Sequence, residues 1–196
     1  MRAESLRSAP VLISRRLVTL TAALALGAVF AAGCGEQAAA LRVGDTRVSR
    51  SDLQAELDAF ASSEAIVPDP ASIAGELPGS YTQDFVGDVL MQRIEFTLAE
   101  QVFDDEGLEL TDSEISATAD QVGQSLDAFP EGLRESLIED LSRRVHLQNE
   151  LGAAGYSTAL REAADAADID ISSRYGSWDG DNYTVQPPDG PAPEPG

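Results

Sequence analysis

Lysine is absent from this chain of 196 residues, so all 13 of its basic side chains are arginines. They stand against 34 aspartates and glutamates, and the formal charge at pH 7 is −21. A nucleic-acid interface needs cationic side chains that neutralise phosphates, so we expect no nucleic-acid partner. Anionic lipid head groups would also repel such a chain, and residence at a membrane would therefore require a hydrophobic anchor.

Cysteine and histidine occur once each, as Cys34 and His146. One cysteine cannot form an intramolecular disulfide, so the fold must be held together by its own core. No second histidine or cysteine could complete a metal site with His146, and the chain has no nucleophile elbow and no phosphate-binding glycine loop. We expect no metal, no cofactor and no catalytic residue. A lone helical histidine is more often a packing or surface residue than a general acid or base.

An uncharged stretch, residues 17–33, follows four arginines and ends directly before Cys34. A basic head, an apolar run and small residues are the layout of a secretory signal. Small residues before a cysteine resemble a bacterial lipobox, although Ala31 stands where that motif prefers leucine. The resemblance implies that Cys34 is acylated and anchors the protein at the extracytoplasmic face of the cell membrane. One alternative is a retained membrane-spanning helix, because about 17 apolar residues reach the lower end of the spanning range. The other alternative is a buried free thiol.

Four segments follow from this pattern: a signal peptide at 1–33, a lipidated spacer at 34–40, a helical domain at 41–185 and a tail at 186–196. The paired arginines Arg15 and Arg16 leave open whether export uses the general or the twin-arginine route. The tail is rich in proline and offers almost nothing apolar to bury, which predicts an extended, disordered segment. A proline-rich peptide ligand is the alternative.

Residues 41–185 show the patterns of a mainly α fold, an orthogonal helical domain of about five helices with a small β element. Alternating residues around Gly44-Asp45 predict a β-hairpin. Serine and threonine followed three residues later by an acid predict capped helix starts at Ser49 and Thr111. The expected helices cover about 49–62, 81–105, 111–126, 130–151 and 157–167, and a final strand at 169–171 could pair with the first.

The helix expected at 81–105 has the strongest apolar periodicity of the chain, which suits a central helix that packs on more than one side. Its apolar stripe is widened by Phe85, Val89, Phe96 and Phe103, which are candidates for a groove that docks polypeptide. The alternative is that all four belong to the core.

Two further features lie near the C-terminus. Tyr175 and Trp178 could form a ligand platform or close the core. Residues 179–182 resemble the start of a calcium loop without its glycine and closing glutamate, so a turn is the better interpretation.

Three stretches, residues 42–53, 89–115 and 169–179, carry in this order a resemblance to the N-terminal domain of the SurA/PrsA group of extracytoplasmic chaperones and peptidyl-prolyl isomerases. The resemblance implies a domain that binds unfolded or extended polypeptide. In that group the domain often accompanies a parvulin domain with paired histidines, and here His146 is alone. The isomerase activity is therefore not carried over, and we do not expect an enzyme.

The sequence thus predicts a membrane-anchored extracytoplasmic lipoprotein with chaperone-like binding of unfolded or exported polypeptides. Its acidity would favour basic clients. The alternative is a non-catalytic envelope docking module for one defined partner. A degenerate isomerase that depends on His146 is a third hypothesis.

Overall fold

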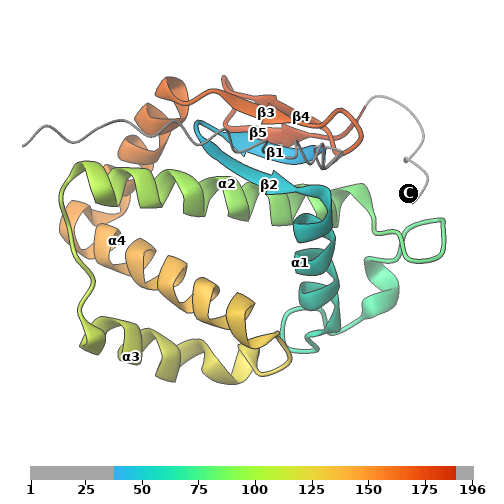
Figure 1. Cartoon of the computed structure of the whole chain (residues 1–196), viewed down its shortest axis with the longest axis horizontal. Coiled ribbons are helices and arrows are strands. Elements are labelled where there is room, and N and C mark those ends of the chain that lie inside the picture. The colour runs from blue at the N-terminus through green and yellow to red at the C-terminus, as the bar shows by residue number, and fades with distance from the viewer. Residues whose placement is uncertain (1–37, 189–196) are drawn as a thin grey trace, which may run out of the picture. The chain divides into compact units, whose positions relative to one another are not determined.

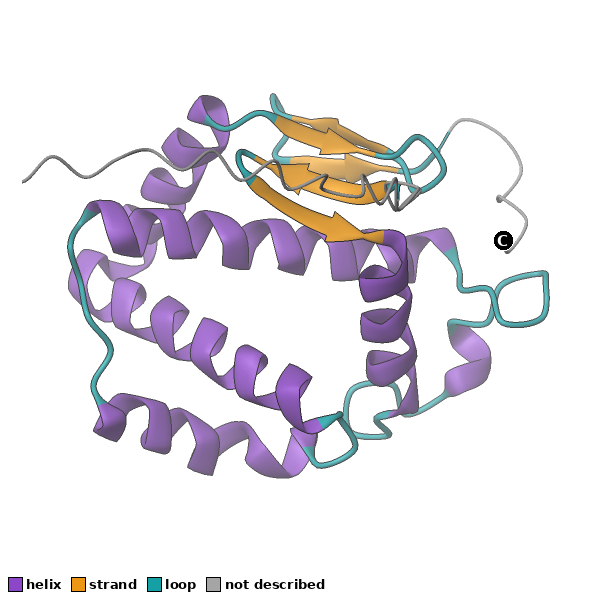
Figure 2. Ribbon diagram, viewed as in Figure 1, coloured by secondary structure: helices purple, strands orange, loops and turns teal. Residues whose placement is uncertain are grey.

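The computed structural model of the chain describes residues 38–188, and it is mainly helical with small antiparallel sheets, as predicted (Figures 1 and 2). Residues 1–37 and 189–196 lie outside the described residues, and with them Cys34, the expected signal peptide and most of the proline-rich tail. The elements are β1 (Ala39–Val43), β2 (Thr46–Ser49), α1 (Arg50–Ser62), η1 (Pro70–Ser72), α2 (Gln83–Asp105), α3 (Asp112–Val122), η2 (Gly123–Leu126), α4 (Glu131–Ala166), β3 (Ile169–Ile171), β4 (Ser177–Asp179) and β5 (Thr184–Gln186).

A three-stranded sheet joins the two ends of the domain. Strand β1 lies between β2 and β3 and is antiparallel to both, with Leu41 opposite Val48 on one side and Ile171 on the other. The predicted pairing of the first strand with residues 169–171 is therefore confirmed. The strand begins at Ala39, and Ala40 is fully buried, so the end of the expected spacer at 34–40 belongs to the fold.

Helix α1 begins where the sequence placed it. The hydroxyl of Ser49 accepts a hydrogen bond from the backbone N–H of Asp52, which satisfies one of the free amide groups at the helix start. The side chains of Leu53, Leu57 and Phe60 are buried at helical spacing. Figure 1 shows α1 standing nearly perpendicular to α2, at the end of the domain where α2 begins.

Helix α2 is the centre of the described domain. The sheet covers one side of it and α4 the other (Figure 1). The consecutive residues 96–99 are all buried, which a helix achieves only when neighbours surround it. The expected central helix packed on more than one side is confirmed, and Gly107 follows its end with φ 64°, a conformation that glycine adopts at helix C-termini.

The capping box that opens α3 is also present. Thr111 accepts a hydrogen bond from the N–H of Glu114, and the Glu114 carboxylate accepts one from the N–H of Thr111. The last turn of the expected helix is the 3₁₀ turn η2, and Leu126 in it is buried. Helix α3 packs against α4.

The two helices expected at 130–151 and 157–167 form one element, α4, that is interrupted at Gly152 with φ 69° and ψ 165°. Gly152 thus ends the first segment as predicted. Gly155 does not extend the interruption, and the second segment continues directly from residue 153.

A second hairpin, β4–β5, was not predicted. Trp178 pairs with Val185, and its ring meets that of Tyr183 with centroids 5.3 Å apart. The turn expected at 179–182 connects the two strands, and the Asp179 carboxylate accepts hydrogen bonds from the backbone and side chain of Asn182. Trp178 packs against the core, which is one of the two roles considered for it.

Candidate functional site

The apolar residues proposed for a peptide groove do not form one. Val89, Phe96 and Phe103 are 3–4% exposed and belong to the core. Phe85 is half-buried and packs against Tyr81, with ring centroids 5.3 Å apart. The groove prediction is wrong for the three buried residues, because the sheet and α4 cover both sides of α2.

A cleft of about 700 Å³ lies instead at the beginning of α1 and α2, and we refer to it as the α1 cleft. Segments far apart in the sequence form it: the first turns of α1, the loop that leads into α2 with the first turn of α2, the turn after β3, and Pro188 beyond β5. Such a volume lies within the range of roughly 300–1,000 Å³ that is typical of ligand sites. Its lining includes Arg50, Gln54, Asp58, Tyr81, Val86, Arg174, Tyr175 and Pro188.

One wall of the α1 cleft is a hydrogen-bonded group around Asp58. The Tyr81 hydroxyl donates to Asp58 Oδ1 at 2.7 Å, and Gln54 Nε2 donates to the same oxygen at 2.9 Å. Burial and the hydrogen bond to Asp58 raise the pKa of Tyr81 to about 12. This group links α1 to Tyr81, which comes directly before Thr82, the N-cap residue of α2.

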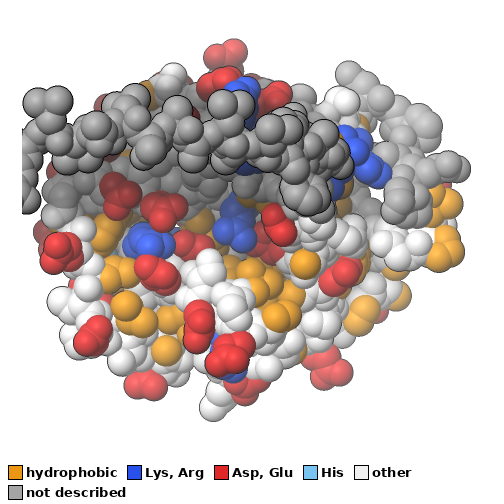
Figure 3. All heavy atoms as spheres, in the orientation of Figure 1, with side chains coloured by type: hydrophobic (Ala, Val, Ile, Leu, Met, Phe, Trp, Pro, Cys, Tyr) orange, Lys and Arg blue, Asp and Glu red, His pale blue; other side chains and the backbone are white. Residues whose placement is uncertain are grey.

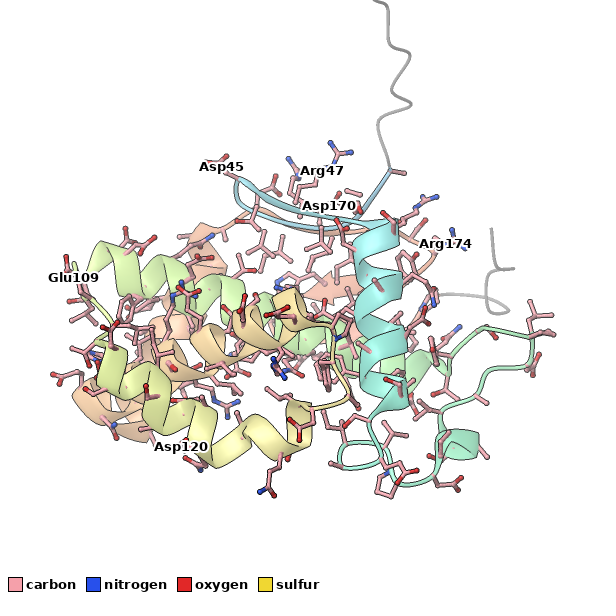
Figure 4. All side chains as sticks on the ribbon, turned by 60° about the horizontal axis from the view of Figure 1, so that its bottom comes forward. Asp45, Arg47, Glu109, Asp120, Asp170 and Arg174 are labelled. Atoms are coloured by element: carbon pink, nitrogen blue, oxygen red, sulfur yellow. The ribbon has the colours of Figure 1, made fainter. Side chains whose placement is uncertain are left out.

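The rim of the α1 cleft on the sheet side holds two arginines. Arg50 is the first residue of α1, and its Nη2 reaches Ser172 Oγ at 3.5 Å. Ser172 opens the turn that carries Arg174, since its carbonyl accepts from the N–H of Tyr175 at 2.8 Å. The Arg174 guanidinium lies 5.3 Å from the centre of the Tyr175 ring, and Figure 4 shows Arg174 beside the N-terminal end of α1.

Sequence reasoning found only part of this site. Tyr175 was considered as a ligand platform or a core residue; it packs against the core and also lines the cleft. Arg50, Arg174 and Tyr81 were not singled out. No local pattern connects them, since the pairing of β3 with β1 is what brings the turn after β3 beside α1.

His146 is outside the α1 cleft. Its Nδ1 lies 2.7 Å from Glu114 Oε1, and its ring meets Phe103 edge to face with centroids 5.3 Å apart. These contacts connect α4 to the first turn of α3 and to α2. The first contact is a hydrogen bond and the second is an aromatic packing contact.

Between residues 38 and 188, no group of three or more histidine, cysteine, aspartate or glutamate side chains is arranged to hold a metal ion. In the same range, no helix combines the length and the apolar character needed to cross a membrane.

Acidic side chains are scattered over the face seen in Figure 3, with few arginines among them. Two other hollows have acidic linings. Asp45, Glu100, Asp104 and Asp105 line one of them, and Asp84 and Asp88 line the other. The arginines at the rim of the α1 cleft therefore contrast with the charge of the surrounding surface.

None of the protein-family models, curated proteins and solved structures compared with this chain matches it.

Proposed function

We propose that this chain is a membrane-anchored extracytoplasmic lipoprotein that binds extended segments of unfolded or exported polypeptides, without catalysis, in the α1 cleft. The anchor is the acylated Cys34, which lies outside the described residues. The resemblance of the order of elements to the SurA/PrsA N-terminal domain supports this function, and the α1 cleft replaces the groove that the sequence suggested.

The observation that carries the proposal is the mixed lining of the α1 cleft. Val86 and Pro78 provide apolar contact, and Tyr81, Tyr175 and Gln54 provide aromatic surface and hydrogen-bonding groups. An extended polypeptide presents apolar side chains and free backbone N–H and C=O groups together. A cleft of about 700 Å³ accommodates a few residues of such a segment.

A blocked cleft tests the function directly. Gln54 is exposed on α1 and lines the cleft, whereas the adjacent Ala55 is exposed on the same helix and does not line it. We expect Gln54→Trp to fill the cleft and to weaken binding at least about tenfold, a loss of roughly 1.4 kcal/mol. Ala55→Trp should bind like the wild type. The readout is fluorescence anisotropy of a labelled, reduced and carboxymethylated secreted protein, which stays unfolded, with the full chain in detergent solution.

Suppression of the aggregation of a freshly reduced secreted protein provides a second readout. We expect the wild type and Ala55→Trp to reduce light scattering and Gln54→Trp to be less effective. If the wild type has no effect at stoichiometric excess and does not bind the carboxymethylated protein, the proposed function is wrong. A single stoichiometric partner recovered from membranes, in the absence of such binding, would favour the docking module for one defined partner.

A further inference from the structure

We propose that the α1 cleft prefers acidic polypeptide segments, whose carboxylates are bound by Arg50 and Arg174. This inference rests on the proposed function and names the class of polypeptide that the cleft takes. It reverses the expectation from overall composition, by which a chain of charge −21 would favour basic clients.

The first argument is the local charge. Among the described residues that line the α1 cleft, Arg50 and Arg174 are basic and Asp58 is acidic, so this lining has a formal charge of +1. The Asp58 carboxylate already accepts hydrogen bonds from Tyr81 and Gln54. The described residues that line the other two hollows include several acids and no arginine. A carboxylate therefore meets a favourable local charge in the α1 cleft and an unfavourable one in the others.

The second argument is the placement of the guanidinium groups. The pairing of β3 with β1 places the turn that carries Arg174 beside the start of α1, where Arg50 donates a hydrogen bond to Ser172, 122 positions away in the sequence. Tyr175 supports the Arg174 guanidinium from below, and an aromatic face holds a guanidinium in place by cation–π attraction. Planar guanidinium groups bind carboxylates with two parallel hydrogen bonds. The N-terminal end of α1, at Arg50, adds a partial positive charge.

The third argument is the surface beside the arginines. Val86 and the rings of Tyr81 and Tyr175 lie in the same lining. A ligand that uses both features alternates acidic and apolar side chains in an extended conformation. This favours a polypeptide segment over a small anion, because a small anion would leave the apolar part of the cleft uncovered.

Three labelled nonapeptides test the preference. They share a leucine-containing extended sequence and carry two glutamates, two glutamines or two lysines at the same positions. We expect the wild-type full chain in detergent to bind the glutamate peptide about tenfold more tightly than the glutamine peptide, because charge-assisted hydrogen bonds are roughly twice as strong as neutral ones. The lysine peptide should bind most weakly, and added salt should reduce the differences.

The cleft variant Arg50→Gln/Arg174→Gln should bind the glutamate and glutamine peptides equally. The matched control is Arg42→Gln/Arg134→Gln, which removes the same charge at two positions outside the cleft lining and should keep the preference. Arg42 forms an exposed ion pair with Asp168, and such pairs contribute little to stability. Circular dichroism and thermal unfolding verify that each variant is folded. If the double variant is unstable, Arg50→Gln alone, at an exposed position, should lower the preference roughly threefold.

The outcomes separate the two proposals. Equal binding of the glutamate and glutamine peptides by the wild type, or tighter binding of the lysine peptide, overturns the acidic preference and leaves polypeptide binding in place. A preference that survives in the cleft variant also overturns it, since the carboxylates would then bind elsewhere. No binding of any peptide or of the carboxymethylated protein would overturn the proposed function itself.

Discussion

At the scale of single residues, the interior of the domain contains charge. Glu56 on α1 is 3% exposed and accepts two hydrogen bonds from Arg93 on α2, from Nη2 at 2.9 Å and from Nε at 3.2 Å. The pKa of Glu56 is raised above its ordinary value, because the effect of burial outweighs the opposing effect of Arg93. Asp140 on α4 is also buried, and its pKa is raised by burial and lowered by Arg93 and Arg143. The Glu56–Arg93 pair joins α1 to α2, and α1 forms one wall of the α1 cleft.

We predict that Glu56→Ala lowers the free energy of unfolding by about 3 kcal/mol, because it leaves a mostly buried guanidinium without its partner. Glu56→Gln should cost less than half as much, since an amide oxygen still accepts a hydrogen bond from Arg93 and burial already favours the uncharged acid. Urea unfolding at neutral pH measures both. Equal losses for the two variants would contradict the assignment, because they would show that the hydrogen bonds contribute nothing.

Glu114 gives the fold a pH dependence. Hydrogen bonds from the side chain and the backbone of Thr111, and then from His146, lower the pKa of Glu114 to about 2 from its ordinary value of 4.5. A lowered carboxyl pKa in the folded state stabilises the protein above the ordinary value, and this contribution is lost as the pH falls from about 4.5 to about 2.

We therefore expect the difference in unfolding free energy between the wild type and Glu114→Gln to be largest at pH 7 and to shrink between pH 4.5 and pH 2. The amide keeps the capping geometry and cannot ionise. The other carboxyl groups are the same in both proteins, so their contributions to the unfolding free energy cancel in the difference. Urea titrations at pH 7, 4.5 and 2.5 give the difference. A difference that stays constant over this range would mean that the capping box does not depend on the charge of Glu114.

At the scale of elements, the interruption of α4 depends on one backbone conformation. The angles of Gly152, φ 69° and ψ 165°, lie in a region that only glycine adopts readily. Tyr156 and Leu160, on the segment that follows, are buried in the core, so the change of direction at Gly152 determines how that segment packs.

Gly152→Ala should lower the free energy of unfolding by roughly 1–3 kcal/mol through backbone strain. The matched change is Gly87→Ala inside α2, where an added methyl group meets no atom within 4 Å. There we expect a gain of about 0.5–1 kcal/mol, because alanine is the better helix former. Thermal unfolding of both variants is the measurement. A stabilising Gly152→Ala would show that α4 can continue without interruption at this point.

Helix α2 shows how far an element could be predicted. Its apolar periodicity gave the position, the length and the central role, since a broad apolar face needs neighbours on more than one side. The same face suggested a groove. Periodicity identifies an apolar helix face, but it does not indicate which other elements pack on that face. The β4–β5 hairpin was missed for a related reason, since its strands have three residues each and alternate over too short a distance.

At the scale of the whole molecule, Cys34 is the residue on which the proposed anchoring depends. Cys34→Ala should remove radiolabelled palmitate incorporation and either release the protein from the membrane or leave its signal uncleaved. Fractionation of cells, with Glu64→Ala as a control at an exposed position, measures the effect. The far-ultraviolet circular dichroism spectrum of the variant should be unchanged. A processed Cys34→Ala protein that stays tightly membrane-bound would rule out the lipid anchor.

The sequence by itself determined the local features: the capped starts of α1 and α3, the hairpin around Gly44, the glycines after α2 and inside α4, and the mainly α class. These depend on residues close together in the chain, where turn chemistry and apolar periodicity act directly. Only the tertiary structure decided which apolar face is covered and where a cleft remains. The pairing of β3 with β1 brings Arg174 beside Arg50 and Tyr81, and contacts between such distant segments leave no local pattern in the sequence.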